Sequence, residues 1–145
     1  ASGSPSAFMQ MYEAHALWAY RGLEFRALGV WVDLDNARKL SVNKQEPIGS
    51  RMYGYYFELA YNVLPLLFEG TDQYVAPWFR YEQYDTQHRV PGGFSADGNA
   101  DRHAFEVGID YKPISQVVLK LDYRNEGADQ GNQPDIIRVG AGFIF

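Results

Sequence analysis

Residues 8–31 read FMQMYEAHALWAYRGLEFRALGVW, and this stretch sets the pattern for the whole chain. Apolar side chains occupy alternate positions on both sides of Arg21 and Gly22, with polar or charged residues between them. Strict alternation is typical of a β-strand with one apolar face, because successive side chains point to opposite faces. Two residues ending in glycine between two such runs predict a tight hairpin in which Tyr20 and Leu23 pair.

The second run is less regular than the first. Leu28, Val30 and Val32 are apolar, although they occupy the same set of alternate positions that carries the charges earlier in the strand. A β-bulge inserts one extra residue and exchanges the two faces of a strand. We therefore expect a strand here and leave its register open, with a bulge near 28–32 as one explanation.

The alternation recurs along the rest of the chain and predicts an all-β fold of about seven antiparallel strands. The further strands are expected at 51–62, 73–85, 103–112, 116–125 and 136–145. Connections alternate between short and long: the Arg21-Gly22 turn, 33–50, 63–72 with a short helix, 85–102, a turn at 113–115, and 125–135. Each strand is close to the roughly 9 to 11 residues that cross a bilayer when tilted.

Composition limits the classes of protein that fit. The 145 residues suit one domain, and 16% of them are aromatic, which favours strands over helices. There is no cysteine, so no disulfide framework forms. The 13 lysines and arginines are scattered among 18 acidic residues, so no nucleic-acid partner is expected. The longest apolar stretch, 63–68, is far too short for a membrane helix.

Three features favour a transmembrane antiparallel β-barrel over a soluble β-sandwich or a lipocalin-like binder. On each expected strand, one set of alternate positions carries mainly polar residues and the other mainly apolar residues; we call these sets the polar and the apolar parity. Charges of both signs occupy the middle of the polar parity, and the connections alternate in length. Aromatic residues also gather at two levels, as they do at the two interfaces of a membrane. We call these levels the first belt (Tyr20, Tyr61, Tyr111, Phe143 and Phe145) and the second belt (Trp31, Tyr53, Tyr81, Phe105 and Tyr123).

The polar parity supplies the candidate functional residues. In a barrel they would line the pore and set its electric field, and they would also stiffen the wall as cross-strand ion pairs. Because acidic and basic residues nearly balance, weak ion selectivity is expected. The candidate pore-lining residues are Glu13, His15, Glu24, Arg26, Glu58, Arg80, Glu82, Glu106, Asp110, Lys120, Asp122, Arg124 and Arg138.

No catalytic residues, metal site or cofactor are predicted. The stretch DGNAD at 97–101 has only part of a calcium-loop pattern, and a solvated loop explains it better. The three histidines, His15, His88 and His103, suit ordinary wall or loop positions. An outer-membrane barrel enzyme or adhesin remains an alternative to a pore, although no serine lies beside a histidine on an expected strand. The expected long loops also carry cations. These either contact lipopolysaccharide phosphates or are simply solvated, and they are Arg38, Lys39, Lys44, Arg89 and Arg102.

Three stretches resemble a known family: APWFRYEQYDTQ at 76–87, ADRHAFEVGIDYKPISQVVLKLDYR at 100–124 and IRVGAGFIF at 137–145. They are similar to the last strands of bacterial outer-membrane porins, most closely the phosphate-selective porin O/P-like group, over roughly 53–145. The resemblance implies an outer-membrane barrel of about sixteen strands, usually a homotrimer, that passes small hydrophilic solutes by diffusion. It also implies that Phe143 and Phe145 form the signal read by the barrel assembly machinery. The family's constriction loop and its lysines have no counterpart here, so phosphate selectivity is not implied.

An odd number of strands carries a further expectation. Single-chain bacterial barrels close with an even number of antiparallel strands, which places both ends of the chain on one side. About seven strands place them on opposite sides. We therefore expect 1–145 to be the C-terminal segment of one larger barrel domain, whose other strands come from another polypeptide or an N-terminal portion. Its long connections are expected outside the cell and its short ones on the periplasmic side.

Overall fold

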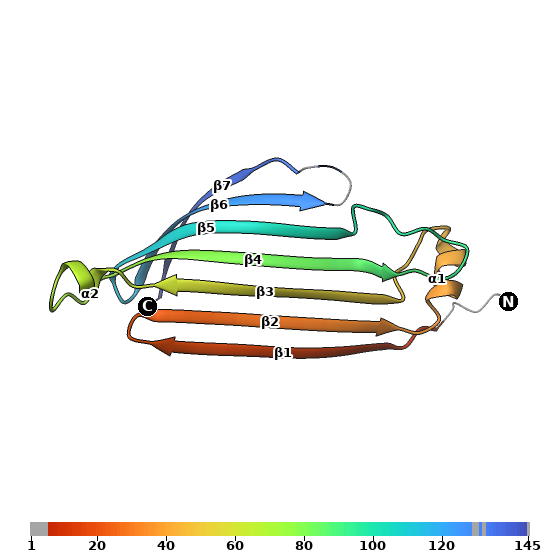
Figure 1. Cartoon of the computed structure of the whole chain (residues 1–145), viewed down its shortest axis with the longest axis horizontal. Helices are drawn as coiled ribbons and strands as arrows, with labels where there is room; N and C mark the ends of the chain where they lie inside the picture. The colour runs from red at the N-terminus through yellow and green to blue at the C-terminus, as the bar shows by residue number, and fades with distance from the viewer. Residues whose placement is uncertain (1–5, 129–130, 132, 145) are drawn as a thin grey trace.

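The structure is a computed structural model that describes residues 6–128, 131 and 133–144. Its strands form one antiparallel sheet in chain order, which confirms the predicted all-β class and strand number (Figure 1). The elements are β1 (Met9–Tyr20), β2 (Leu23–Leu34), α1 (Ala37–Lys44), β3 (Arg51–Tyr61), α2 (Leu64–Leu67), β4 (Tyr74–Arg89), β5 (Asp101–Ile114), β6 (Val117–Ala128) and β7 (Ile136–Phe143).

The hairpin of β1 and β2 forms as the sequence predicts. Arg21 and Gly22 both have positive φ, 47° and 83°, as the two-residue turn that matches the strand twist requires. Tyr20 pairs with Leu23, and the pairing continues without interruption to Met9 and Leu34. The bulge considered for 28–32 is therefore absent, because both neighbours of β2 pair with it in continuous register.

Leu28, Val30 and Val32 are apolar residues on the otherwise polar face of β2, and the structure explains them without a bulge. Val32 lies directly opposite Met11 on β1 and Met52 on β3, so apolar side chains meet one another across three strands at this level. Val32 is buried. Cross-strand pairing between apolar residues thus stabilises the regular register without exchanging the faces.

The connections alternate between the two ends of the sheet. The turn at 21–22, α2 and the turn at 115–116 lie at one end, which we call the α2 end, and α1 and the 90–100 connection lie at the other, the α1 end (Figure 1). The short helix expected within 63–72 is confirmed as α2.

Helix α1 was not predicted, because 33–50 carries no apolar periodicity. A buried hydroxyl orders this loop instead: Ser41 Oγ donates to the carbonyl of Ala37 (2.8 Å) and accepts from the amide of Ile48 (3.0 Å). The carbonyl of Pro47 accepts from the side-chain amide of Gln87 (2.8 Å), which fastens the loop to β4.

Strands β4 and β5 are longer than the sequence predicts. The polar residues 86–89 and 101–102 were assigned to a loop, yet they belong to strands. Side chains here do not alternate in polarity, so the extension depends on backbone pairing, which the side-chain pattern does not record. Arg89 and Arg102 are therefore strand residues rather than loop cations, and His88 lies at the end of β4 rather than in a loop.

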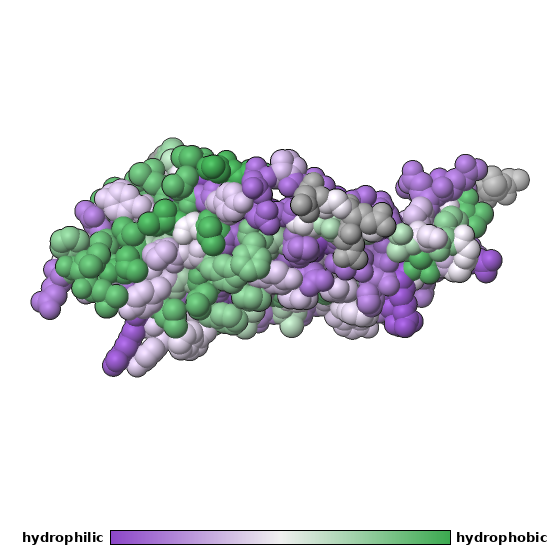
Figure 2. Space-filling view, turned by 45° about the horizontal axis from the view of Figure 1, so that its top comes forward, coloured by the Kyte–Doolittle hydropathy of each residue, from purple (hydrophilic) through white to green (hydrophobic). Residues whose placement is uncertain are grey.

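The register places the apolar parity of all seven strands on one face of the sheet. One row that runs from strand to strand, for example, joins Trp18, Phe25, Leu59, Phe79, Val107, Tyr123 and Ile137. This apolar face has no covering layer among the described residues, and its side chains on β7 are largely exposed: Ile137 exposes 74% and Val139 82% of its surface. Figure 2 shows hydrophobic residues gathered toward the α2 end and hydrophilic residues toward the opposite end.

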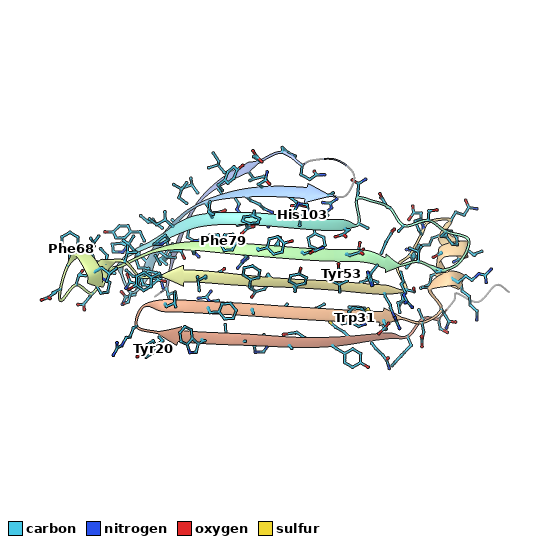
Figure 3. The ribbon with its side chains drawn as sticks, in the orientation of Figure 1. Tyr20, Trp31, Tyr53, Phe68, Phe79 and His103 are labelled. Carbon is cyan, nitrogen blue, oxygen red and sulfur yellow. The ribbon has the colours of Figure 1, made fainter. Side chains whose placement is uncertain are left out.

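The sheet is a single curved layer, and the apolar face is its outer, convex side. Figure 3 shows Trp31, Tyr53 and Phe79 on the face turned to the viewer, while β6 and β7 curve away behind it. The β-sandwich considered as an alternative needs two stacked sheets, and the described strands form only one. No helix within the described residues is long and apolar enough to cross a membrane.

The register of β1 and β2 can be tested by disulfide formation, because the chain has no cysteine of its own. Glu13 lies directly opposite Val30, on the same face. The double variant Glu13→Cys/Val30→Cys is expected to form an intramolecular disulfide under mild oxidation, visible as a reducible shift in gel mobility. The control Glu13→Cys/Trp31→Cys is expected to form none. Efficient cross-linking in the control would instead support the bulge.

Candidate functional site: a charged wall

The concave face carries a row of charges that alternate in sign. Read across β2 to β6, the directly paired residues are Arg26, Glu58, Arg80, Glu106 and Arg124. Opposite charges on directly facing residues stabilise neighbouring strands, whereas like charges would repel. The row ends on apolar residues at both margins of the sheet, Leu17 on β1 and Ile136 on β7.

Glu58 links the first half of this row. Its carboxylate accepts from Arg80 Nη2 (2.6 Å) and Nε (3.0 Å), and Arg26 Nη1 lies 3.5 Å away. Arg26 also donates to Glu24 (3.3 Å), one level nearer the α2 end. The Arg80 guanidinium lies over the ring of Tyr56, 4.8 Å from its centroid, which fixes the cation further.

Arg124 is the centre of the second half. Its guanidinium donates to the carboxylates of Glu82, Glu106 and Glu126, and only 14% of the side chain is exposed. Glu106 is 3% exposed and also meets Arg138 Nη2 (3.2 Å), while Glu126 also meets Arg102 (3.1 Å). Burial strengthens these interactions, and it also makes the loss of one partner costly.

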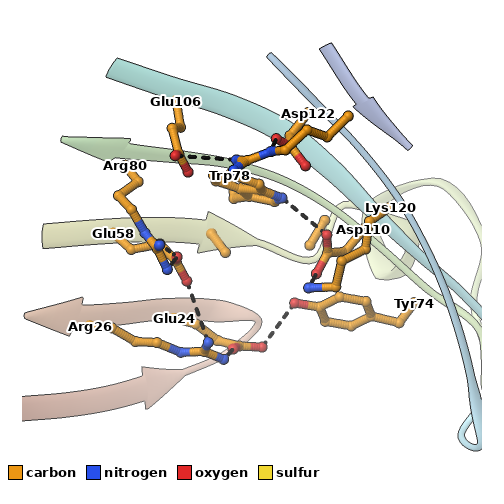
Figure 4. A pocket seen from close by; sticks show the side chains of 13 residues that line it. Glu24, Arg26, Glu58, Tyr74, Trp78, Arg80, Glu106, Asp110, Lys120 and Asp122 are labelled. Carbon is orange, nitrogen blue, oxygen red and sulfur yellow. Dashed lines mark hydrogen bonds and ion pairs between the residues drawn. The ribbon is translucent and has the colours of Figure 1, made fainter. Parts of the chain in front are cut away.

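A second group of polar residues lies beside the row and surrounds a hollow of about 230 Å³ (Figure 4). Asp110 accepts from Lys120 Nζ (3.0 Å) and from the indole Nε1 of Trp78 (3.0 Å). Asp122 accepts from Arg138 Nε (2.5 Å). We use the name charged wall for the connected residues on this face of the sheet, namely Glu24, Arg26, Glu58, Tyr74, Trp78, Arg80, Glu82, Arg102, Glu106, Asp110, Lys120, Asp122, Arg124, Glu126 and Arg138.

Several contacts in the charged wall pass over an intervening strand. Tyr74 Oη on β4 donates to Glu24 on β2 (3.0 Å), and Arg138 on β7 reaches Glu106 on β5. Alternate strands are about 9.6 Å apart in a flat sheet, since neighbours are about 4.8 Å apart. Such contacts form where side chains lean toward one another on the concave face.

Cations and carboxylates differ in exposure. The side chains of Arg26, Lys120 and Arg138 are 46–51% exposed, whereas the carboxylates that they pair with are 3–31% exposed. The charged wall therefore holds nearly balanced charges but presents mainly guanidinium and ammonium groups to solvent.

The structure places all thirteen candidate residues on this one face, as the parity predicts. It does not bring them all together. Glu13 and His15 lie on β1, where they contact each other at 3.2 Å and are exposed. The remaining candidates belong to the connected groups around Glu58, Arg124 and Asp110.

Sequence reasoning missed four members of the wall. Arg102 and Glu126 were assigned to loops, because the strands that hold them were predicted too short. Trp78 and Tyr74 share the parity of Arg80, so alternation alone could have identified them. Aromatic residues were instead assigned to the opposite face, which directed attention away from these two.

Other candidates lie outside the wall. His88 contacts the rings of Trp31 and Tyr53 and lies 3.5 Å from Asp85. His103 shares the apolar parity with Phe105. In the 97–101 stretch Asp97 accepts from the amide of Asn99 (2.9 Å), and no group of three or more potential metal ligands occurs among the described residues.

Of the expected assembly signal, Phe143 lies at the end of β7 opposite Val117 and is 68% exposed. Phe145 lies outside the described residues. Of the loop cations, Arg38 and Lys39 lie with Lys44 on α1.

Comparison with known proteins found a relative of this chain. An uncharacterized protein of Aquifex aeolicus (strain VF5) is 29% identical over 144 residues, which cover 93% of this chain and 33% of that protein. The chain therefore spans about a third of the length of the relative it matches. No protein family and no solved structure matches the chain.

Removing Arg124 is expected to destabilise the sheet more than removing any exposed cation of the wall. Arg124→Met leaves three carboxylates without their shared partner, and breaking a buried ion pair costs about 3 to 5 kcal/mol. The matched variant Arg26→Met removes an exposed partner and is expected to cost at most about 1 kcal/mol. Thermal or denaturant unfolding in detergent, followed by circular dichroism, measures both. Equal costs would show that Arg124 has no special role.

Proposed function

We propose that the chain forms part of the wall of an outer-membrane, porin-type β-barrel, a water-filled channel for passive diffusion of small hydrophilic solutes or ions. One observation carries the proposal. A single sheet presents an exposed apolar face on its convex side and a charged, ion-paired face on its concave side. In water the apolar face would cost free energy, whereas in lipid it would not. A polar interior inside an apolar exterior is the arrangement of a membrane barrel.

The second belt gives independent support, because two of its steps, from Tyr53 to Tyr81 and from Phe105 to Tyr123, leave the rows of directly paired residues. Trp31 lies opposite Tyr53, but opposite Tyr53 on β4 lies Asp85, and the belt continues at Tyr81, nearer the α2 end. The belt therefore crosses the sheet diagonally. Strands of a barrel tilt relative to its axis, so a level plane crosses successive strands at positions shifted in one direction.

The first belt shifts in the same direction. Tyr111 lies at the level of Leu119 on β6 and Ala141 on β7, and the belt continues at Phe143, again nearer the α2 end. Two parallel, inclined belts are expected if both mark interfaces of one bilayer around tilted strands. The resemblance to the phosphate-selective porin O/P-like group supports the same function, with the outer membrane as location and a homotrimer as assembly.

The two margins of the sheet support a larger barrel. Within the described residues β1 pairs only with β2, and β7 only with β6, so each has one unpaired edge. Unpaired backbone groups in lipid cost several kcal/mol each. We propose that further strands, from another polypeptide or another part of a longer chain, pair with both edges. The greater length of the Aquifex relative is consistent with this.

The location of the two faces is tested with single-tryptophan variants. The chain has three tryptophans: Trp18 and Trp31 on the apolar face and Trp78 in the charged wall. Three variants each keep one of them, with phenylalanine at the other two positions. In vesicles, brominated acyl chains are expected to quench Trp18 and Trp31, and aqueous iodide is expected to quench Trp78. Quenching of Trp78 by the brominated lipid, or a protein that stays in solution without detergent, would contradict the proposal.

The unpaired margins give a separate prediction for the 16.5 kDa chain in detergent. Because β1 and β7 each need a neighbour, the chain is expected to associate through these edges. Light scattering is expected to give masses above that of one chain, and the outward amides of β1 and β7 are expected to be protected from hydrogen exchange. A monodisperse single chain with unprotected edge amides would show that the edges need no partner.

A further inference from the structure

Trp78 is the largest side chain in the charged wall, and its indole lies close to a glycine of the neighbouring strand. Gly108 is directly opposite it on β5. A Cβ atom at position 108 would lie 2.6 Å from both Cε2 and Cζ2 of the indole, so the ring covers the glycine. No other residue type leaves this space, because any side chain would meet both the indole and Asp122 (2.8 Å). Gly108 thus leaves room for the indole close to the backbone of β5, where the ring lines the hollow.

One hydrogen bond and small neighbours hold this ring in place. The indole Nε1 donates to Asp110 (3.0 Å), which also binds Lys120 and thereby fixes the carboxylate. Ala60 and Ala76, which also line the hollow, are small and leave room beside the ring. The result is an aromatic platform at the edge of an open hollow rather than an aromatic residue enclosed in a core.

The groups around the platform favour an anionic ligand that also has hydroxyl groups. Arg26, Lys120 and Arg138 are about half exposed and can each bind an anion without losing their carboxylate partners. The carboxylates of Asp110 and Glu58 are fixed acceptors with further lone pairs, suited to hydroxyl donors. A bare inorganic anion would use the cations but neither the platform nor the acceptors.

We propose that this hollow is a binding subsite for acidic sugars, such as uronic acids, that pass along the wall. The sugar ring stacks on Trp78, because its C–H groups meet the negative face of the indole. The carboxylate of the sugar binds the exposed cations, and its hydroxyls donate to Asp110 and Glu58. This inference rests on the proposed pore and replaces the weak ion selectivity that the charge balance alone predicts.

The test uses the complete barrel, that is, this chain together with the strands that pair with its two margins, in planar lipid bilayers. Glucuronate, glucose and inorganic phosphate are the probes, added to a potassium chloride solution. Glucuronate is expected to halve the open-channel current at a concentration about tenfold lower than glucose or phosphate does, which corresponds to about 1.4 kcal/mol. Equal block by glucuronate and glucose would show that the cations do not contribute. Equal block by phosphate and glucuronate would show that the Trp78 platform does not contribute.

Variants assign the effect to the platform. Trp78→Ala is expected to raise the half-blocking concentration of glucuronate about tenfold, each block being measured relative to the variant's own open-channel current, while Trp78→Phe retains most of the block. Gly108→Ala displaces the indole and is expected to act like Trp78→Ala. The matched control is Gly29→Ala on the opposite face, where a Cβ meets nothing within 4 Å, so block should be unchanged. Block that is insensitive to both Trp78→Ala and Gly108→Ala would overturn the proposal.

A second measurement separates failure of this inference from failure of the proposed pore. The variant that keeps only Trp78 is titrated with glucuronate in detergent, where no channel is needed. A saturable change in its fluorescence without any bilayer conductance would leave the subsite standing and contradict the pore. Conductance without block and without a fluorescence change would contradict the subsite and leave the pore standing.

Discussion

The structure depends on one constraint: each of the seven strands must pair with its neighbours in a register that places its apolar side chains on one face of the sheet and its charged side chains on the other. A slip of one residue between any two strands would move charges such as Arg80 onto the apolar face and break every pair beyond it. The alternating row from Arg26 to Arg124 opposes such a slip, since each charge faces its opposite only in this register. The turn at Gly22 fixes the register of β1 with β2, and the charged row fixes the registers from β2 to β6.

The charged wall combines stability and chemistry in the same residues. Pairs that are buried, above all those of Arg124 with Glu106, hold neighbouring strands together. Pairs with one exposed partner, such as Lys120 with Asp110, leave a cation available to a solute. The same ion pairs that stiffen the sheet therefore position the groups that a passing molecule meets.

Alternation in the sequence was sufficient to predict the seven strands, the hairpin pair of Tyr20 and Leu23 and the face of every candidate residue, because a period of two translates directly into sides of a sheet. It did not predict the ends of β4 and β5, where backbone pairing extends through residues without alternation. It also could not predict α1, which is ordered by the buried hydroxyl of Ser41 rather than by apolar periodicity. The platform of Trp78 was missed because it depends on Gly108, a residue far away in sequence that only the register brings opposite.

The contacts that pass over a strand have a geometric consequence. By joining alternate strands, Tyr74 with Glu24 and Arg138 with Glu106 limit how far the sheet can flatten, and so they help to set its radius of curvature. In a closed barrel of given strand tilt, the radius grows with the number of strands. Lengthening or removing these side chains would favour a wider cylinder, so a few polar contacts on the inner surface can influence how many strands complete the circle.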